Sequence, residues 1–506
     1  MLFENSVLIC LAIVVISYFL WNCHRVFFIR RLDTLPGPKT WPFIGNCHML
    51  LGCEEFLDIV LKMTEDYSSP FQFWLGSKLF IGIYEPDDVK TILDSKNCID
   101  KSVLYKVVPL FGMGLVTAPE FIWTRMRKVT SKTFSPTMMK IFFNIFVEQS
   151  AIFAHQLEKD DLSGNEIILQ EQISHCAWRM ACDSMMGIKL EPNKNNDHLK
   201  AVKRSKNILL HRMKNTLLFS DVIFNLTALG GKQKEDTNLV YSLTDEMIQQ
   251  RKHKLKNLDI LKDENNQIHR TFFDILMEGS RKDIDEASGK ENFTLEQIRD
   301  IVITMLLTAS DSISIAMNFV IFMLANFPEV QEKVLEELLE IYGTETIKSV
   351  PIEYGDLEQM HYLERVIKET MRIFPVVPII ARQVTEDLKI GEVILPKGTN
   401  IFIPIIKMHR NEKYWPNPLM FDPDRFLPER NPKSQSYYMP FSAGSRNCIG
   451  IKYAIMSMKV VLATLARTFV FKVNKSIKID EIKLKFSTTI STEKPLKVKL
   501  EKRYFQ

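Results

Sequence analysis

Residues 441–450 read Phe-Ser-Ala-Gly-Ser-Arg-Asn-Cys-Ile-Gly, and an apolar run that favours a helix follows at 451–471. A cysteine just ahead of a helix start faces free backbone N–H groups and the positive end of the helix dipole, which favour the thiolate form of Cys448. Gly444 and Gly450 let the backbone turn sharply and approach a flat partner, where a Cβ would clash. Arg446 offers a planar cation that suits a carboxylate. Together these features predict a haem with Cys448 as axial ligand and Arg446 on a propionate.

The common alternative for Cys448 is an ordinary buried cysteine without a partner. The spacing argues against it, because Phe-x-x-Gly-x-Arg-x-Cys-x-Gly is expected by chance on the order of 10⁻⁷ times per position. The stretch resembles the haem-binding loop of the cytochrome P450 family, the haem-thiolate monooxygenases. Extended through Ala454, it is most similar to the animal family-4 branch, particularly its insect members. That branch oxidises fatty acids and other long-chain lipids.

The composition is that of a well-packed globular protein: 506 residues, of which 46% are hydrophobic and 25% charged. Neither a Gly/Ser/Pro-rich linker nor an internal repeat divides the chain, so we expect one catalytic domain over residues 32–506. The net charge of +4 is too small to indicate nucleic-acid binding. The eight cysteines form no C-x-x-C pair and no zinc-type cluster with histidine, which favours a reducing compartment over a disulfide framework.

The N-terminus carries an apolar run at residues 7–21, followed by His24, Arg25, Arg30 and Arg31. The run is shorter than the roughly twenty residues that cross a bilayer core, but apolar neighbours on both sides can extend it. A cleaved signal peptide is the alternative, and Glu4 together with the bulky residues after the run argues against it. The basic cluster on the C-terminal side places the rest of the chain in the cytosol. We expect residues 1–31 to form an uncleaved anchor, and the resemblance implies the endoplasmic reticulum membrane.

Hydrophobic periodicity predicts a mainly α protein with a minor β component. The predicted helices cover residues 140–157, 167–186, 295–326, 328–342, 360–373 and 452–468, and the predicted strands cover 71–74, 79–84, 388–390 and 400–404. Two polar, charge-mixed stretches, 254–267 and 281–291, are predicted loops. The proline-rich segment 35–38 resembles the hinge of microsomal family members. The resemblance implies the cytochrome P450 fold, a helix-rich lobe and a small β-rich lobe behind an N-terminal membrane anchor.

Trp123 and Arg127 lie four residues apart on a predicted helix. One helical turn brings the indole N–H and the guanidinium to the same face, where both can donate to one carboxylate. Such a pair is often no more than packing. The resemblance implies that both side chains hold a haem propionate. It gives the same role to Arg382, which follows an apolar run at 376–380 that would otherwise be an ordinary buried strand.

Glu369 and Arg372 lie three residues apart on the predicted helix that ends at Phe374. A Glu–Arg pair at this spacing is usually a weakly stabilising surface pair. The chain supplies a third partner, Arg425, upstream of the cysteine loop. The resemblance implies a buried Glu–Arg–Arg network that locks the haem-binding region, where loss of one member would leave a charge in a dry interior.

The centre of the predicted helix 295–326 reads Thr-Ala-Ser-Asp-Ser at residues 308–312. Hydroxyls and a carboxylate in an otherwise apolar helix need partners. The resemblance implies that Asp311 and Ser312 relay protons to bound dioxygen. The chain departs from the family pattern with Ala309 at the usual glycine and Ser312 at the usual threonine. Many family-4 relatives carry, three residues before this acid, a glutamate that esterifies a haem methyl. Thr308 occupies that place, so we expect non-covalent haem b.

The resemblance implies a haem-dependent monooxygenase that inserts one oxygen atom of O₂ into a lipophilic substrate: a fatty acid, hydrocarbon, terpenoid or xenobiotic. Electrons would come from NADPH through the flavin-containing NADPH–cytochrome P450 reductase, with cytochrome b5 as a further candidate donor. A basic stripe is the expected docking face, composed of Arg125, Lys128, Lys132 and Lys452. Two alternatives stay open, a haem-thiolate isomerase or dehydratase without external electrons and a non-catalytic haem- or lipid-binding protein. The Asp311-Ser312 pair counts against the isomerase.

Five apolar segments are candidates for the substrate cavity. They are residues 104–115, 207–223, 302–312, 376–380 and 486–490.

Overall fold

A computed structural model describes residues 15–20, 32, 35–50, 55–159, 164–190, 197–261, 270–282, 293–344, 347, 350–432 and 434–504. The α-helices are α2 (Phe56–Asp66), α3 (Pro86–Asp94), α4 (Glu120–Thr130), α5 (Pro136–Lys159), α6 (Gln170–Met186), α7 (Asp197–Lys214), α8 (Asp221–Asn225), α9 (Ala228–Leu261), α10 (Phe272–Lys282), α11 (Leu295–Asn326), α12 (Pro328–Tyr342), α13 (His361–Ile373), α14 (Ile405–His409), α15 (Ser434–Tyr437) and α16 (Ile451–Thr468). The strands are β1 (Phe71–Leu75), β2 (Lys78–Gly82), β3 (Ile380–Gln383), β4 (Leu388–Ile390), β5 (Val393–Leu395), β6 (Asn400–Ile403), β7 (Phe469–Lys472), β8 (Leu484–Phe486), β9 (Ile490–Thr492) and β10 (Lys499–Lys502).

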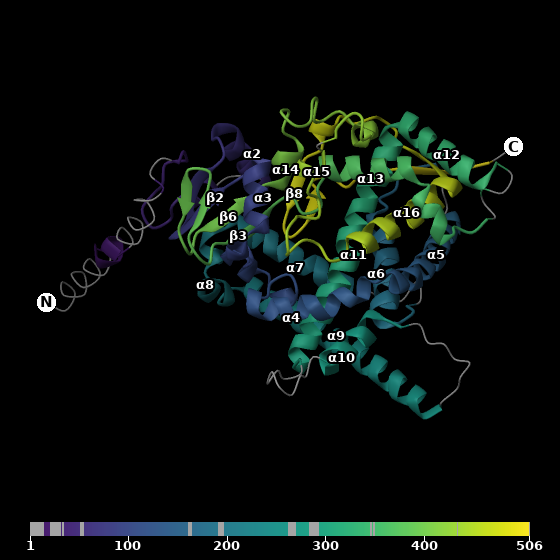
Figure 1. Ribbon diagram of the computed structural model, residues 1–506, viewed down its shortest axis with the longest axis horizontal. Helices are drawn as coiled ribbons and strands as arrows, with labels where there is room; N and C mark the ends of the chain where they lie inside the picture. The colour runs from purple at the N-terminus through teal and green to yellow at the C-terminus, as the bar shows by residue number, and fades with distance from the viewer. Residues whose placement is uncertain are drawn as a thin grey trace.

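The main sheet has the strand order β1-β2-β6-β3. β2 and β6 run parallel although more than 300 residues separate them, and the other two pairings are antiparallel. The described residues also form three two-stranded pairs, β4–β5, β7–β10 and β8–β9. The sheet lies at one end of the long axis and helices fill the rest of the molecule (Figure 1). The predicted fold class, mainly α with small sheets, is therefore confirmed.

The central helix is α11, which is apolar on nearly all of its faces and almost completely buried. A helix that is hydrophobic all round belongs in a core. The Thr294–Gln297 capping box starts it, and Pro328 opens the next helix after one intervening residue. Among the described residues, α11 has the length and apolarity of a membrane span, yet 78% of its most apolar window is buried inside the protein. It is a core helix, and it passes through the middle of the fold (Figure 1).

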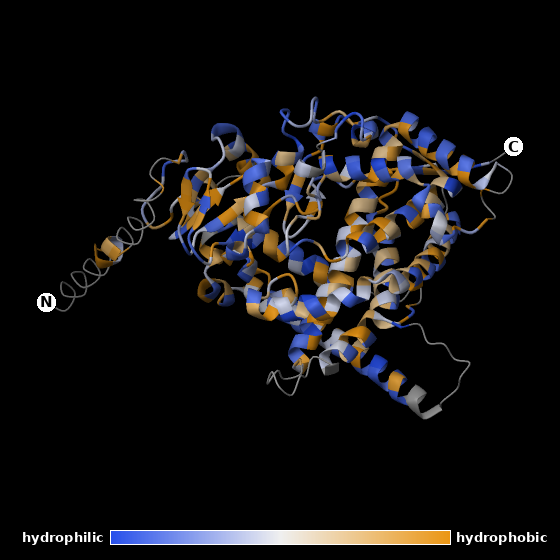
Figure 2. Cartoon of the chain, in the orientation of Figure 1, coloured by the Kyte–Doolittle hydropathy of each residue, from blue (hydrophilic) through white to orange (hydrophobic). Residues whose placement is uncertain are grey.

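Most predicted elements are confirmed to within a few residues, and those at 295–326, 328–342 and 388–390 have the predicted bounds. One predicted loop was wrong. Residues 254–261 continue α9, while the rest of that stretch, 262–267, lies outside the described residues. Lysine and leucine have high helix propensity, so a charge-mixed stretch of this kind can remain helical. Figure 2 shows hydrophilic and hydrophobic residues mixed along the coloured part of α9 where it projects from the molecule.

Two further predictions fall largely on undescribed residues. Of the predicted loop at 281–291, the first two residues end α10 and the remainder lies outside the described residues. Of the predicted anchor, residues 15–20 are helical and their apolar side chains are exposed. The other residues of that anchor, apart from these six, lie outside the described part of the chain.

Candidate active site

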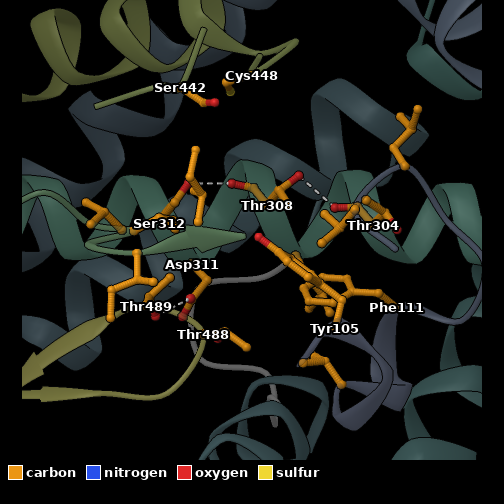
Figure 3. Close-up of a pocket in the computed structure, with 18 of the residues that line it drawn as sticks. Tyr105, Phe111, Thr304, Thr308, Asp311, Ser312, Ser442, Cys448, Thr488 and Thr489 are labelled. Atoms are coloured by element: carbon orange, nitrogen blue, oxygen red, sulfur yellow. Dashed lines mark hydrogen bonds between the residues drawn. The ribbon is translucent and has the colours of Figure 1, made fainter. Parts of the chain in front are cut away.

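An internal cavity of about 430 Å³ lies between α11, the cysteine loop and the β8–β9 hairpin. Its volume falls in the usual range for small-molecule sites. Its walls are mainly apolar, and all five segments that the sequence nominated contribute to them. Figure 3 shows Cys448 and Ser442 facing the cavity from one side of α11, with Thr308 and Ser312 on the helix itself.

The loop 441–450 is held by its own backbone. The Cys448 N–H donates to the Phe441 carbonyl at 2.9 Å, and α16 begins directly after Gly450. Gly444 has a φ of +71°, and a Cβ there would lie 1.9 Å from the Leu93 carbonyl oxygen of α3. This glycine therefore serves the packing of the loop against α3. A Cβ placed on Gly450 would meet only the Cys448 sulfur, at 3.9 Å, which is an ordinary van der Waals distance. The protein atoms themselves therefore give no steric reason for a glycine at this position.

The accessible surface of Cys448 opens onto the cavity, whose walls shield the thiol from bulk solvent. Burial raises the pKa of its thiol, while the Gly450 backbone N–H and the Arg127 guanidinium lower it. The net direction is opposite to the one expected from the helix dipole alone, because desolvation outweighs the two favourable groups. A coordinated metal ion deprotonates a thiol outright, so a thiolate at this place depends on the metal it binds.

Arg127 connects α4 to the cysteine loop. Its guanidinium donates to the Asn447 backbone oxygen at 2.9 Å and to the Asn447 side-chain oxygen at 2.7 Å. Trp123 is buried beside it, with the Arg446 guanidinium 5.0 Å from its ring centroid. The structure thus brings together Trp123, Arg127 and Arg446, three residues that the sequence assigned to one site.

Arg446 is buried, and it donates to the Ile99 carbonyl at 2.9 Å and to the Ala118 carbonyl. Its Nε is buried without a hydrogen-bond partner. Arg382 is also buried, and the Tyr105 hydroxyl and the Ala381 carbonyl are its recorded partners.

Three basic side chains line this wall of the cavity, the buried Arg382 and Arg446 and the half-buried Lys101. Burial, together with both arginines, lowers the pKa of Lys101 well below its usual range. Within the described residues none of the three makes an ion pair with a carboxylate. Buried charges are normally paired, so this wall fits a group that carries two carboxylates, and a haem with its propionates is such a group.

Glu369, Arg372 and Arg425 form a buried network behind the cysteine loop. Glu369 accepts from Arg372 Nε at 2.7 Å and pairs with Arg425 Nε at 3.3 Å. The Glu369 and Arg372 side chains have no exposed surface. Burial raises the pKa of Glu369, although both arginines favour its charged form.

Each arginine of this network also holds backbone carbonyls. Arg372 donates to His409 and Pro418, both at 2.7 Å, and Arg425 donates to Pro416 and Asn417 at 2.6 and 2.8 Å. The network therefore fixes α13 to the chain that leads into the cysteine loop.

Hydroxyl groups follow one face of α11 at intervals of four residues. Ser312 Oγ donates to the Thr308 carbonyl at 2.7 Å, and Thr308 Oγ1 donates to the Thr304 carbonyl at 2.7 Å. Asp311 is turned toward Thr489 and away from Cys448 (Figure 3). Its two oxygens accept from Lys206 Nζ at 2.9 and 3.0 Å. Asp311 and Ser312 both line the cavity, but each has its own partners.

Sequence reasoning missed Lys206 and Lys101, and it nominated Thr489 only as a member of the apolar segment 486–490. Lys206 lies 105 positions from Asp311 and Thr489 lies 178 positions from it. No local pattern marks such pairs. Lys101, by contrast, lies four residues before Tyr105, next to the nominated cavity segment 104–115. A basic residue beside an apolar segment was the signal that could have identified it.

Three features together fit a haem-thiolate protein: a cysteine facing an apolar cavity, basic side chains beside it that pair with no carboxylate among the described residues, and a mainly helical fold. The family model described as Cytochrome P450 matches residues 35–500. This chain belongs to the cytochrome P450 family.

Relatives with known family assignments support the same placement. The chain is 30% identical to cytochrome P450 4c21 of Blattella germanica, with 94% of each chain covered. It is 32% identical to cytochrome P450 4c3 of Drosophila melanogaster, covering 90% of this chain and 87% of the relative. It is 31% identical to human cytochrome P450 4V2, covering 92% and 89%. The resemblance to family 4 is confirmed, and the chain is a haem-dependent monooxygenase, an oxidoreductase that uses O₂.

Proposed function

We propose that residues 32–506 form a catalytic domain that faces the cytosol from the endoplasmic reticulum membrane, held there by an N-terminal anchor at residues 1–31. The enzyme receives electrons from NADPH through a flavin reductase and hydroxylates a lipophilic substrate. The observation that carries the proposal is the placement of Cys448 on an apolar cavity next to buried cations without carboxylate partners. The exposed apolar side chains of residues 15–20 support the membrane location.

Cys448 would bind the haem iron, and Trp123, Arg127, Arg382 and Arg446 would hold the propionates, with Lys101 beside them. The bound haem would supply the cleavage of the O–O bond and the insertion chemistry. The chain's residues position the substrate, deliver protons and exclude water. The haem is non-covalent haem b, since the α11 residue three before Asp311 is Thr308, whose hydroxyl already donates to a backbone carbonyl.

Asp311 and Ser312 provide the proton path. The Ser312 hydroxyl donates a hydrogen bond to the Thr308 carbonyl. Its oxygen lone pairs therefore face the cavity and can accept a hydrogen bond from a water molecule there. Asp311, held by Lys206 Nζ at 2.9 Å, is the acid of that path. Glu369, Arg372 and Arg425 take no part in proton transfer, and they keep the cysteine loop in place.

Electrons enter from the side of α4 and α16. Lys128 and Lys132 are exposed at and just beyond the end of α4, and Lys452 is exposed at the start of α16. Arg125 offers less charge to a partner than the three lysines, because its guanidinium stacks on the Phe293 ring, 4.4 Å from the ring centroid. A reductase with an acidic docking face would be steered to these charges, and cytochrome b5 would use the same face.

The decisive experiment is the spectrum of the ferrous–CO adduct. The wild-type protein should show the far-red-shifted Soret band of a thiolate ligand, and Cys448→Ser should lose it. Cys47→Ser is the matched control, because Cys47 is buried but does not line the cavity. A shifted band that persists in Cys448→Ser would refute the assignment. Product analysis by mass spectrometry, with the reductase and NADPH present, then identifies the substrate among fatty acids, hydrocarbons, terpenoids and xenobiotics.

A further inference from the structure

The end of the cavity formed by α7, α11 and the β8–β9 hairpin carries one charged pair. Lys206 of α7 donates to both oxygens of Asp311 and to Thr489 Oγ1, at 2.9, 3.0 and 2.8 Å. An ammonium group has three N–H donors, and all three are used. The Lys206 and Asp311 side chains are only 23% and 30% exposed. The positive charge of Lys206 is therefore balanced by the Asp311 carboxylate beside it.

The other cations of the described cavity wall lie at the cysteine loop. They are Lys101, Arg127, Arg382 and Arg446. The proposed function assigns this group to the haem, and the present inference rests on that assignment. A substrate carboxylate would then meet no unpaired cation in the described part of the cavity, and a buried carboxylate without a counter-ion is strongly disfavoured.

Two neutral polar groups line other parts of the cavity wall, and Figure 3 shows one of them, Thr304, beyond Thr308 from Asp311. Ser205, next to Lys206, and Thr304 of α11 are 5% and 2% exposed. The hydroxyl oxygen of each is buried without a hydrogen-bond partner. A hydroxyl group can both donate and accept, so these two side chains can satisfy a neutral polar group but cannot balance a charge.

We infer that the cavity selects uncharged lipids with a neutral polar head, of the class of long-chain alcohols, and discriminates against free fatty-acid anions. The paired Lys206–Asp311 carries the selectivity, because pairing removes the charge that a carboxylate would need. Ser205 and Thr304 each offer a neutral hydroxyl to such a head from the cavity wall. The apolar walls accept the hydrocarbon chain.

The test compares three ligands of one chain length, 1-decanol, methyl decanoate and decanoate, by calorimetric titration of the full-length haem-loaded protein at pH 8. The alcohol and the ester should each bind at least about tenfold more tightly than the carboxylate. Equal or tighter binding of decanoate by the wild-type protein overturns the inference.

Two variants then separate charge from shape. Asp311→Asn leaves Lys206 without its counter-ion, so decanoate should bind at least about tenfold more tightly, while 1-decanol changes less than about twofold. The double variant Lys206→Gln/Asp311→Asn is neutral again and should lose that gain. If the single variant folds and decanoate does not respond, the pair does not set the selectivity.

The ferrous–CO spectrum of the same preparation distinguishes failure of this inference from failure of the proposed function. A thiolate-type band together with tight decanoate binding refutes only the substrate class. Absence of the band in the wild-type protein refutes the haem assignment and, with it, the premise that the other cations are occupied.

Discussion

Replacing Arg372 by alanine removes four hydrogen bonds from a site with no exposed surface. Two of them go to Glu369, at 2.7 and 2.9 Å, and one each to the carbonyls of His409 and Pro418. Glu369 would keep only the Asp422 N–H at 3.1 Å and Arg425 at 3.3 Å. The variant therefore strands a partly compensated charge in the interior.

Removing one partner of a buried ion pair costs about 3–5 kcal/mol. Because Arg425 remains near Glu369, we expect Arg372→Ala to lower the free energy of unfolding by about 3 kcal/mol, which is a large part of the 5–15 kcal/mol typical of folded domains. Lys368→Ala on the same helix is the control. Its pair with Glu364 is about one third exposed, and Glu364 also bonds Lys459, so its loss should cost less than about 0.5 kcal/mol.

Urea unfolding measures the difference, and haem content per polypeptide gives a second readout. Arg372→Lys should fall between wild type and Arg372→Ala, because lysine keeps the charge but lacks the fork that reaches four acceptors. If Arg372→Ala unfolds at the same urea concentration as Lys368→Ala and binds haem fully, the network does not stabilise the cysteine loop.

Four other perturbations follow from the structure. Ser312→Ala should keep the substrate-induced spin shift while NADPH consumption diverts to peroxide, and Ser312→Thr should couple as well as wild type; full coupling in Ser312→Ala would give the proton path to another group. Lys128→Glu with Lys132→Glu should slow reduction by the reductase and flatten its salt dependence, and an unchanged rate would place the docking face elsewhere. Acid–organic extraction should release all haem as unmodified haem b, since Thr308 stands where relatives carry glutamate; haem that stays with the polypeptide contradicts this. Burial and Arg372 lower the pKa of His409 to about 3, below its usual value of about 6.5, so stability is lost as pH falls below 6.5. Between pH 6 and pH 4, the free energy of unfolding of His409→Gln should fall less steeply than that of the wild type, by up to about 1.4 kcal/mol per pH unit. An unchanged slope would mean that another group titrates.

The parts of the site that sequence predicted are those whose partners lie close along the chain. Glu369 and Arg372 are three residues apart, and the ten residues around Cys448 fold mainly on themselves. The bounds of α11 could be predicted because its capping box and the following proline are local signals. For these features, the residue types and their spacing along the chain were sufficient for a correct prediction.

The missing parts depend on contacts that no local pattern encodes. Lys206 reaches Asp311 across 105 positions, and it lies on α7, a helix whose charge-mixed sequence gave no prediction. The pKa of the Cys448 thiol was misjudged for a related reason, because the helix dipole is visible in sequence and desolvation by the surrounding fold is not. Long-range pairing and burial are properties of the assembled chain.

The contact between Arg127 and Asn447 gives α4 a mechanical role. One neighbour of Arg127 along the helix is the exposed Lys128, and Arg127 itself grips the residue before Cys448 through bonds of 2.7 and 2.9 Å. A protein that contacts Lys128 would therefore touch the same helical turn that holds the peptide group between Asn447 and Cys448. The position of Cys448 and the conformation of this exposed helical turn are therefore mechanically coupled.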